Sequence, residues 1–288
     1  MAGRDYRVLH GDGGVAFGVH DLPEAELRRL LEDPEGLLRL NLDRPVKIDH
    51  GSLMVEAELS LVRGPVRVAY KQYRPRNRWK AFCGLLRRSR ARRAWRLGRE
   101  LSAHGIATAR PLAMCEPHRP GLSGRSYLAT LWIPSAVNLH LYGWALADRP
   151  LRQRLRSAGR CAESLGRLLG RMHALGIAHR DLKGANLLVR GHHDPTGDGP
   201  VRTYLVDVDG VRICRRLRAG RRAANLARLA TSTEAHRWLT RSIYCRFVRA
   251  YAGQFPAGQV QWKQLWREIS SRRRRIVQRK RRRGEEVL

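Results

Sequence analysis

The stretch Gly176-Ile-Ala-His-Arg-Asp-Leu-Lys-Gly-Ala-Asn-Leu-Leu-Val189 decides the fold of this 288-residue chain. It places a carboxylate, Asp181, five residues before an amide, Asn186. Phosphoryl transfer needs a carboxylate that accepts the proton of the attacking hydroxyl, and an oxygen close by that binds the magnesium ion of the nucleotide. A loop of this length lets both side chains reach one site, and Mg²⁺ accepts the neutral carbonyl oxygen of asparagine as a ligand.

The flanks of this loop carry the periodicities of a helix and of two strands. Upstream, apolar residues recur at helical spacing between Ala162 and Met172, which predicts a half-buried helix that leads into the loop. Downstream, Leu187–Val189 is a short apolar strand. A second strand, Thr203–Val206, is followed directly by Asp207, so a second carboxylate is expected beside the loop.

This pattern resembles the catalytic loop of the protein-kinase fold, H-R-D-x-x-x-x-N, which His179-Arg180-Asp181 and Asn186 match residue by residue. Asp207 stands where that fold carries the magnesium-binding aspartate of D-F-G. The resemblance implies an α+β, bilobal, protein-kinase-like fold with a small β-rich N-lobe and a helical C-lobe. An ordinary loop that happens to carry these letters is the alternative, and the agreement between motif and flanks disfavours it.

The protein-kinase fold also has an ATP-binding lysine, which is expected upstream of the catalytic loop. Apolar and polar residues alternate over 46–73 around a turn at Arg63-Gly-Pro65, which predicts a β-hairpin. Its second strand, Val66-Arg-Val-Ala-Tyr-Lys71, sets Lys71 in the place of the V-A-I-K lysine, which binds the α- and β-phosphates of ATP. A surface lysine at a strand end is the alternative, but only six residues of the chain are lysine.

Three further residues are candidates for the nucleotide site. In the protein-kinase fold the lysine pairs with a glutamate on the next helix. The helix predicted over 89–104 has one acid, Glu100, which is either that partner or an ordinary helix charge. The strand predicted over 126–132 ends in Ile133-Pro-Ser135, a hinge between lobes, and backbone groups near Leu131 and Ile133 are expected to meet adenine.

The composition points to a polyanionic partner. The formal net charge is +32, from 57 basic and 25 acidic residues. A GC-rich genome explains arginine in place of lysine but not the excess of positive charge, which predicts contact with an anionic glycolipid, an anionic membrane surface or, less favoured, nucleic acid. Singly scattered cysteines, no visible leader and no apolar run of membrane-spanning length predict a cytoplasmic protein.

Four regions are expected along the chain. Residues 1–40, with turn material at Gly11–Gly14, are predicted to be an N-terminal extension, 41–132 the N-lobe and 133–270 the C-lobe. Residues 271–288 are predicted to be a frayed, basic C-terminal tail that contacts acidic lipid or nucleic acid.

Two internal stretches are candidate ligand-binding segments. The basic, aromatic stretch 74–93 suits either a solvated face or a phosphate-rich contact. His192, His193, Asp194 and Asp198 suggest a metal site, but a solvated Gly/Pro-rich insertion is the preferred interpretation.

The chain is similar to bacterial lipopolysaccharide-core kinases, the Kdo/WaaP family with its InaA-like relatives. The catalytic loop is shared by protein-kinase-like folds in general, whereas Asp207-Val-Asp209 and the segment Gly105-Ile-x-Thr-x-x-Pro-Leu-Ala113 are more particular to this group. The resemblance spans residues 45–270. The other segments that support it are Lys71-Gln-Tyr-Arg-Pro-Arg76, Arg90-Ala-Arg-Arg-Ala-Trp95 and Tyr127-Leu-Ala-Thr130.

This resemblance implies ATP-dependent phosphorylation of a sugar hydroxyl in a lipid-linked core oligosaccharide, at the cytoplasmic face of the inner membrane. It implies that Asp181 is the base, that Asn186 and Asp207 bind Mg²⁺, and that Lys71 binds ATP. Lys183 is expected to neutralise charge on the γ-phosphoryl group during transfer. One departure from the motif is that Asp209 occupies the glycine position of D-F-G.

Two other functions stay open. A Ser/Thr protein kinase is one, although the chain has no A-P-E signature. An inactive pseudokinase that binds anionic membrane or RNA is the other. The presence of Lys71, Asp181, Asn186 and Asp207 together opposes it, because an inert scaffold has no physical need for all four.

Overall fold

The computed structural model describes residues 6–43, 45–49, 51–75, 89–118, 124–191 and 199–284. The chain forms two compact units, one of Met1–His104 and Ala109–Trp132, the other of Gly105–Thr108 and Ile133–Leu288. Most of the predicted basic stretch and the whole of the His192–Asp198 segment lie outside the described residues. Among the described residues, no helix combines the length and apolar content needed to cross a membrane.

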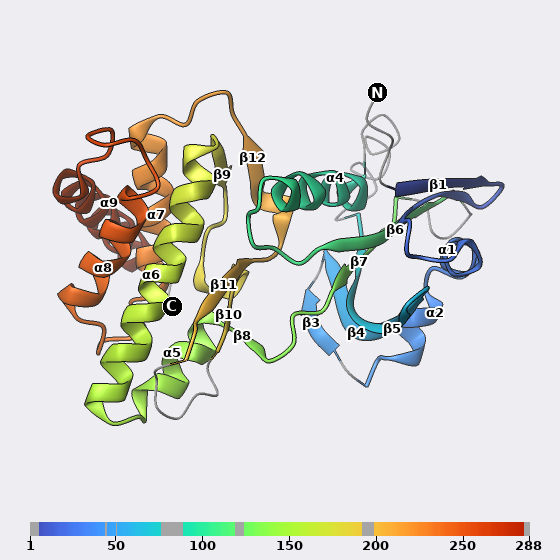
Figure 1. Cartoon of the computed structure of the whole chain (residues 1–288), viewed down its shortest axis with the longest axis horizontal. Helices are drawn as coiled ribbons and strands as arrows, with labels where there is room; N and C mark the ends of the chain where they lie inside the picture. The colour runs from blue at the N-terminus through green and yellow to red at the C-terminus, as the bar shows by residue number, and fades with distance from the viewer. Residues whose placement is uncertain are drawn as a thin grey trace. The chain divides into compact units, whose positions relative to one another are not determined.

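The first unit is built on a seven-stranded antiparallel sheet with the order β1-β2-β6-β7-β5-β4-β3, drawn in Figure 1. The predicted hairpin is confirmed, because β4 and β5 pair without interruption from Ser52↔Tyr73 to Leu61↔Gly64. The strands are β1 (Tyr6–Gly11), β2 (Gly14–Val19), β3 (Pro45–Asp49), β4 (Ser52–Leu61), β5 (Gly64–Tyr73), β6 (Pro111–Pro117) and β7 (Ser126–Leu131).

Helices cover both faces of this sheet: α4 (Arg90–Ala103) on one, and α1 (Glu24–Glu32) with α2 (Gly36–Leu40) on the other. Helix α4 packs on β6 and β7, and its Ala91 N–H donates to the hydroxyl of Ser126. The Tyr70 hydroxyl donates to the Pro34 carbonyl, between α1 and α2, at 2.8 Å. Because side chains alternate along β5, Lys71 faces the α4 side of the sheet.

The N-terminal segment is an integral part of the sheet, so the predicted extension over 1–40 is wrong for β1 and β2. These strands form a hairpin around Asp12-Gly13, and β2 pairs with β6 from Gly14↔Pro117 to Gly18↔Ala113. Gly14 has a φ of +131°, and a side chain there would overlap the backbone of Glu116. The pairing joins strands far apart in the chain, and such a contact leaves no local sequence pattern.

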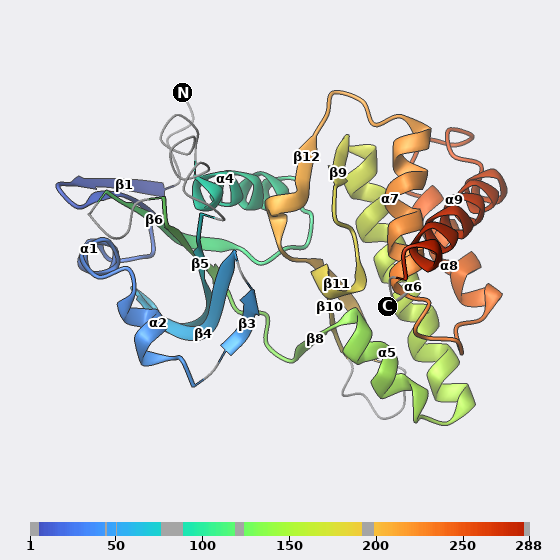
Figure 2. The same ribbon diagram turned by 180° about the vertical axis from the view of Figure 1, so that it is seen from behind.

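The second unit is mainly helical. In it α6 packs against α8 and α7 against α9, as the two views in Figures 1 and 2 show. Its helices are α5 (Leu139–Ala147), α6 (Leu151–Ala174), α7 (Ala219–Ser232), α8 (Arg241–Ala252) and α9 (Trp262–Arg282). Its short strands are β8 (Ala136–Asn138), β9 (Ile177–His179), β10 (Leu187–Arg190), β11 (Arg202–Leu205) and β12 (Val211–Ile213).

The helix and strands predicted around the catalytic loop are confirmed. Helix α6 leads into the loop, and β10 and β11 pair in antiparallel register after it. The residues that predicted the helix are all buried: Ala162, Leu165, Leu168, Leu169 and Met172. The loop is therefore held between a core helix and a small sheet.

Helix α9 continues to Arg282, so the prediction of a frayed tail from residue 271 is wrong for the residues described. Arg272 pairs with Glu268 one turn earlier at 2.9 Å, and Arg273 pairs with Glu234 at 2.8 Å. The helix is also anchored by buried Ile269. Arginine is a good helix former, and the ion pair to Glu234 is a tertiary contact that the basic sequence does not reveal.

A buried histidine makes stability depend on pH. His173 of α6 is 2% exposed, and its Nδ1 lies 2.8 Å from the Tyr251 hydroxyl oxygen. Burial lowers the pKa of His173 to about 3, whereas an unfolded histidine titrates near pH ~6.5. Between these values the unfolded state binds more protons, so the free energy of unfolding falls as the pH decreases from ~6.5 towards 3.

Urea titrations over this acidic range should show that loss, and His173→Gln should flatten it. The flattening is partial, because burial also lowers the pKa of His140 and of His236. If the free energy of unfolding depends on pH in the same way for the parent and the His173→Gln variant, His173 is not responsible for the loss.

Candidate active site

The predicted catalytic loop lies between β9 and β10. Asp181 has 63% of its side-chain surface exposed, and its Oδ2 lies 2.8 Å from Nζ of Lys183. Asn186 is buried, and its Nδ2 donates to the backbone carbonyl of Asp181 at 2.8 Å. This hydrogen bond closes the loop and leaves Oδ1 of Asn186 as the acceptor atom of the amide. Asp181, Lys183 and Asn186 are thus brought together.

Asp207 joins this loop from the end of β11. The N–H of Val206 donates to the Asn186 carbonyl at 2.9 Å, and Nε2 of His179 donates to the Asp207 carbonyl at 3.0 Å. Asp207 has φ 58° and ψ 59°, in the left-handed region. A residue other than glycine adopts this region at a cost of about 1–3 kcal/mol, and such residues concentrate at functional sites. The backbone that carries the second carboxylate is therefore fixed beside the loop, as predicted.

Gly210 explains the departure from D-F-G at Asp209. The ring of His179 packs against Gly210, where an added Cβ would lie 2.6 Å from the imidazole Cε1. The Arg180 N–H also donates to the Gly210 carbonyl at 2.8 Å. The position that steric contact restricts to glycine is therefore 210, one residue later than the motif suggests.

Helix α7 holds the loop through three side chains on one face, at i, i+3 and i+7. Asn225 Oδ1 accepts the His179 N–H at 2.9 Å, and Ser232 Oγ accepts the Gly184 N–H at 2.9 Å. Arg228 donates to the Arg180 carbonyl at 2.9 Å. None of these three residues belongs to a motif that the sequence displays. The available signal was three polar residues, Asn225, Thr231 and Ser232, at buried positions of an amphipathic helix.

Replacing Asn225 with alanine should destabilise the protein by about 1–3 kcal/mol, because the buried His179 N–H would lose its acceptor. We expect a lower urea midpoint at an unchanged m-value. Arg221→Ala, at an exposed position of the same helix, is the control and should stay within about 0.5 kcal/mol of the parent. Equal midpoints for the Asn225 and Arg221 variants would contradict the positioning role of Asn225.

In the first unit, Lys71 is buried within β5, between Met54 of β4 and Leu128 of β7. Its Nζ lies 4.8 Å from the centre of the Tyr73 ring. The guanidinium of Arg90, at the start of α4, lies 4.7 Å from the same ring. Two cations therefore gather on the α4 side of the sheet, and Arg90 is a phosphate-site candidate that no motif in the sequence indicates.

Glu100 is not paired with Lys71 in the described part of the chain. Arg90 begins α4, and ten residues of helix, with a rise of 1.5 Å each, separate it from Glu100. Gly98, two residues before Glu100, packs on Pro111 at the start of β6. Of the two readings of Glu100, the structure favours the ordinary helix charge.

The segment expected to meet adenine has part of its backbone already bonded. The Leu131 N–H donates to the Arg110 carbonyl at 2.8 Å, and the Trp132 N–H donates to the Arg67 carbonyl at 2.9 Å. Leu131 therefore has no N–H to offer a base. Ile133 belongs to the second unit, so the two predicted residues lie on either side of the change between units.

A model of the lipopolysaccharide kinase (Kdo/WaaP) family matches residues 66–251, which include Lys71, the catalytic loop and Asp207. The chain belongs to this family. The match confirms the resemblance on which the motifs were interpreted.

Curated relatives of this Kdo/WaaP family member are named as kinases. The chain is 30% identical over 214 residues to the 3-deoxy-D-manno-octulosonic acid kinase of Xanthomonas axonopodis pv. citri, which covers 71% of this chain and 74% of the relative. It is 35% identical over 148 residues to the kinase of the same name from Xanthomonas campestris pv. campestris strain B100, covering 50% of each chain. The chain is accordingly a kinase.

A solved structure supports the predicted fold. The structure titled "WaaP in complex with acyl carrier protein" matches with a TM-score of 0.62 and 21% identity, over 90% of this chain and 97% of that one. At this identity the likeness bears on the fold alone. The kinase thus has the predicted α+β, protein-kinase-like fold, with a curled sheet in its N-terminal part and helices in its C-terminal part.

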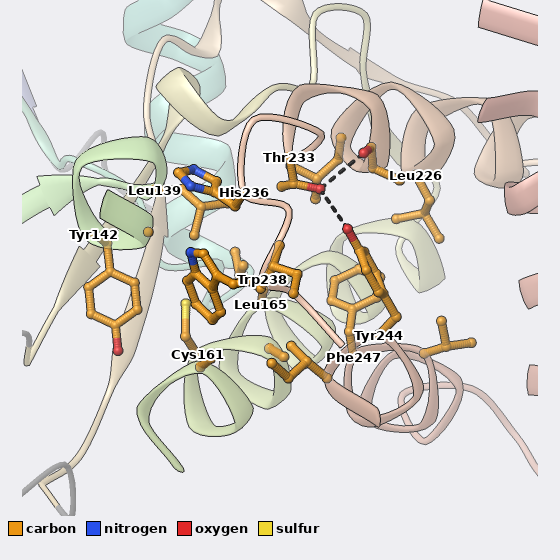
Figure 3. Close-up of a pocket in the computed structure, with 18 of the residues that line it drawn as sticks. Leu139, Tyr142, Cys161, Leu165, Leu226, Thr233, His236, Trp238, Tyr244 and Phe247 are labelled. Carbon is orange, nitrogen blue, oxygen red and sulfur yellow. Dashed lines mark hydrogen bonds between the residues drawn. The ribbon is translucent and has the colours of Figure 1, made fainter. Parts of the chain in front are cut away.

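A separate cavity of about 100 Å³ lies among the helices of the second unit and is shown in Figure 3. Its lining is almost entirely apolar and includes Leu139, Leu165, Phe247 and Trp266. None of the predicted catalytic residues lines it. A nucleotide inside would leave its polar groups without hydrogen bonds, so this cavity does not suit ATP.

Proposed function

We propose that this kinase transfers the γ-phosphoryl group of ATP to a sugar hydroxyl of a lipopolysaccharide-core-like glycolipid at the cytoplasmic face of the inner membrane. The observation that carries the proposal is the bonded cluster of Asp181, Asn186 and Asp207, which provides one base and two oxygen ligands on a single framework. The name of the relatives, 3-deoxy-D-manno-octulosonic acid kinases, supports a sugar acceptor.

Asp181 accepts the proton of the acceptor hydroxyl. Its exposed carboxylate has room for a substrate, and its present partner is Lys183. An exposed ion pair of this kind contributes only about 0–1 kcal/mol, so Lys183 can exchange the carboxylate for an anionic phosphoryl group. The lysine then neutralises charge on the group in transfer.

Asn186 and Asp207 have the chemistry that Mg²⁺ requires, since both offer hard oxygen donors. The hydrogen bond from Nδ2 of Asn186 to the Asp181 carbonyl fixes the orientation of the amide, so that its oxygen Oδ1 is the atom that would bind the metal. Hydrogen bonds of the Asp207 carbonyl and of the Val206 N–H hold the backbone at this position, which fixes the point from which the carboxylate extends. When bound, the ion shields the negative charge of the triphosphate.

The remaining residues bind the nucleotide. Lys71 and Arg90 attract the α- and β-phosphates, and the aromatic ring of Tyr73 keeps the two cations in place between strand and helix. Backbone groups around Leu131 and Ile133, other than the bonded N–H groups of Leu131 and Trp132, approach adenine. In this assignment the first unit, with its N-terminal hairpin, is the nucleotide lobe, and the second unit is the lobe that carries the catalytic loop. Glu100 is left without a role in catalysis.

Transfer of radiolabel from γ-labelled ATP to extracted cell-envelope glycolipid, compared with transfer to total protein, tests this function. We expect label in the glycolipid, dependent on Mg²⁺ and released with the sugar fraction after mild acid. Label confined to protein would support a Ser/Thr protein kinase instead. Nucleotide binding without transfer to either fraction would support an inactive pseudokinase.

A further inference from the structure

Helix α9 carries a dense positive charge. Between residues 262 and 284 there are eleven basic residues and one acidic residue, Glu268. In the second half of the helix the exposed positions are 274, 275, 278, 279, 281 and 282, a spacing that marks one side of an α-helix. Gln278 occupies one of them. The other five form what we call the arginine stripe: Arg274, Arg275, Arg279, Arg281 and Arg282.

The opposite side of α9 is fixed to the second unit. Leu265 and Ile269 are buried, and the Trp266 ring lies 5.5 Å from the Tyr244 ring of α8. Ile269 and Trp266 also close the apolar cavity. The arginine stripe is therefore presented on a packed helix rather than on a loose tail.

Two acidic groups at α9, among the residues that the structure describes, are already paired with other arginines. Glu268 pairs with Arg272, and Glu234 pairs with Arg273. Within the described residues, none of the arginines of the stripe has an acidic partner. Between Arg274 and Arg282 the helix rises about 12 Å, so five guanidinium groups share a short, exposed surface. Such a surface has the charge that complements a layer of phosphate groups.

We infer that the arginine stripe docks this kinase on the anionic phospholipid headgroups of a bilayer. The inference rests on the proposed function, because a lipid-linked acceptor requires the enzyme to work at a membrane surface. Because the apolar side of α9 is packed against the protein, the stripe meets such a surface through its charge, as clustered basic residues on a helix do. The stripe has no aromatic side chain on which a base could stack, which disfavours single-stranded nucleic acid as its partner.

Binding of the full chain to vesicles tests the stripe without any acceptor. We expect binding to vesicles of phosphatidylcholine mixed with phosphatidylglycerol, none to phosphatidylcholine alone, and weakening by added salt. The combined replacement of Arg274, Arg275, Arg279 and Arg282 by glutamine should lower the partition coefficient on the order of 100-fold. Glutamine keeps the helix propensity, so circular dichroism and thermal melting should match the parent.

The control variant removes the same number of charges elsewhere. Arg63, Arg152, Arg237 and Arg241 are exposed, lie outside α9, and can be replaced by glutamine together. This variant should bind the mixed vesicles within a few-fold of the parent. Equal loss in both variants would mean that net charge alone drives binding, and would overturn the assignment to the stripe.

An activity assay then separates docking from catalysis. The stripe variant should phosphorylate a water-soluble, deacylated acceptor like the parent and lose activity towards an acceptor embedded in vesicles. Parent-like vesicle binding by the stripe variant, or loss of RNA binding with vesicle binding intact, would overturn the inference. If the parent phosphorylates neither acceptor, the proposed function fails, and the vesicle measurement still judges the stripe by itself.

Discussion

Asp181→Asn is expected to lower turnover by roughly 10²–10⁴-fold while nucleotide affinity stays within a few-fold of the parent. Asparagine has nearly the same shape but cannot accept the proton of the attacking hydroxyl. The side chain is 63% exposed, and its ion pair with Lys183 is weak, so the fold should tolerate the change. Steady-state phosphate transfer and equilibrium binding of a fluorescent nucleotide measure the two quantities separately.

Asp148→Asn is the matched control for this variant, because Asp148 is an exposed aspartate of the same unit at the end of α5. It should leave turnover unchanged. If Asp181→Asn loses nucleotide binding as severely as turnover, the site has collapsed and nothing follows about the base. Parent-like turnover in Asp181→Asn would exclude Asp181 as the group that accepts the proton.

Asp207→Asn should lower turnover on the order of 10³-fold and shift the dependence on Mg²⁺ to higher concentration, because a neutral amide is a weaker ligand than a carboxylate. Asparagine tolerates the left-handed backbone conformation that Asp207 adopts at φ 58°, so the turn should be preserved. Titration of turnover with Mg²⁺, alongside thermal melting, gives both readouts.

Asp207→Ala separates the charge from the backbone. Alanine removes the carboxylate as asparagine does, but it also disfavours the left-handed conformation by about 1–2 kcal/mol. We therefore expect the alanine variant to melt at a lower temperature than the asparagine variant at similar residual activity. Saturation of Asp207→Asn at the same Mg²⁺ concentration as the parent would remove Asp207 from the metal site.

The loop could be predicted because phosphoryl transfer fixes residue types at short, regular spacing. Asp181 and Asn186 lie within one turn of chain, and the helix and strands around them follow the periodicities of their apolar residues. The strand that carries Lys71 could be predicted in the same way, from the alternation of apolar and polar residues. In both segments the same few residues determine the chemistry and the local structure.

Contacts between distant segments could not be predicted. The pairing of β2 with β6 brings the N-terminal hairpin into the sheet, and the side chain of Asn225 reaches His179 from a helix far along the chain. The pairing of Arg273 with Glu234 ties α9 to the rest of the second unit where composition suggested a frayed tail. In each case the contacting residue is distant in the sequence, so local propensity and periodicity cannot reveal the contact.

The most direct test of whether Lys71, Asp181, Asn186 and Asp207 serve one nucleotide is labelling of the full chain with an acyl-phosphate derivative of ATP. This reagent acylates lysines that lie beside the bound phosphates, and mass spectrometry locates the label. Label is expected on Lys71 and Lys183, is expected to disappear with excess ATP and Mg²⁺, and should persist at Lys71 in Asp181→Asn. Label on lysines such as Lys47 and Lys263 alone, or label at Lys71 that ATP does not displace, would contradict the shared site.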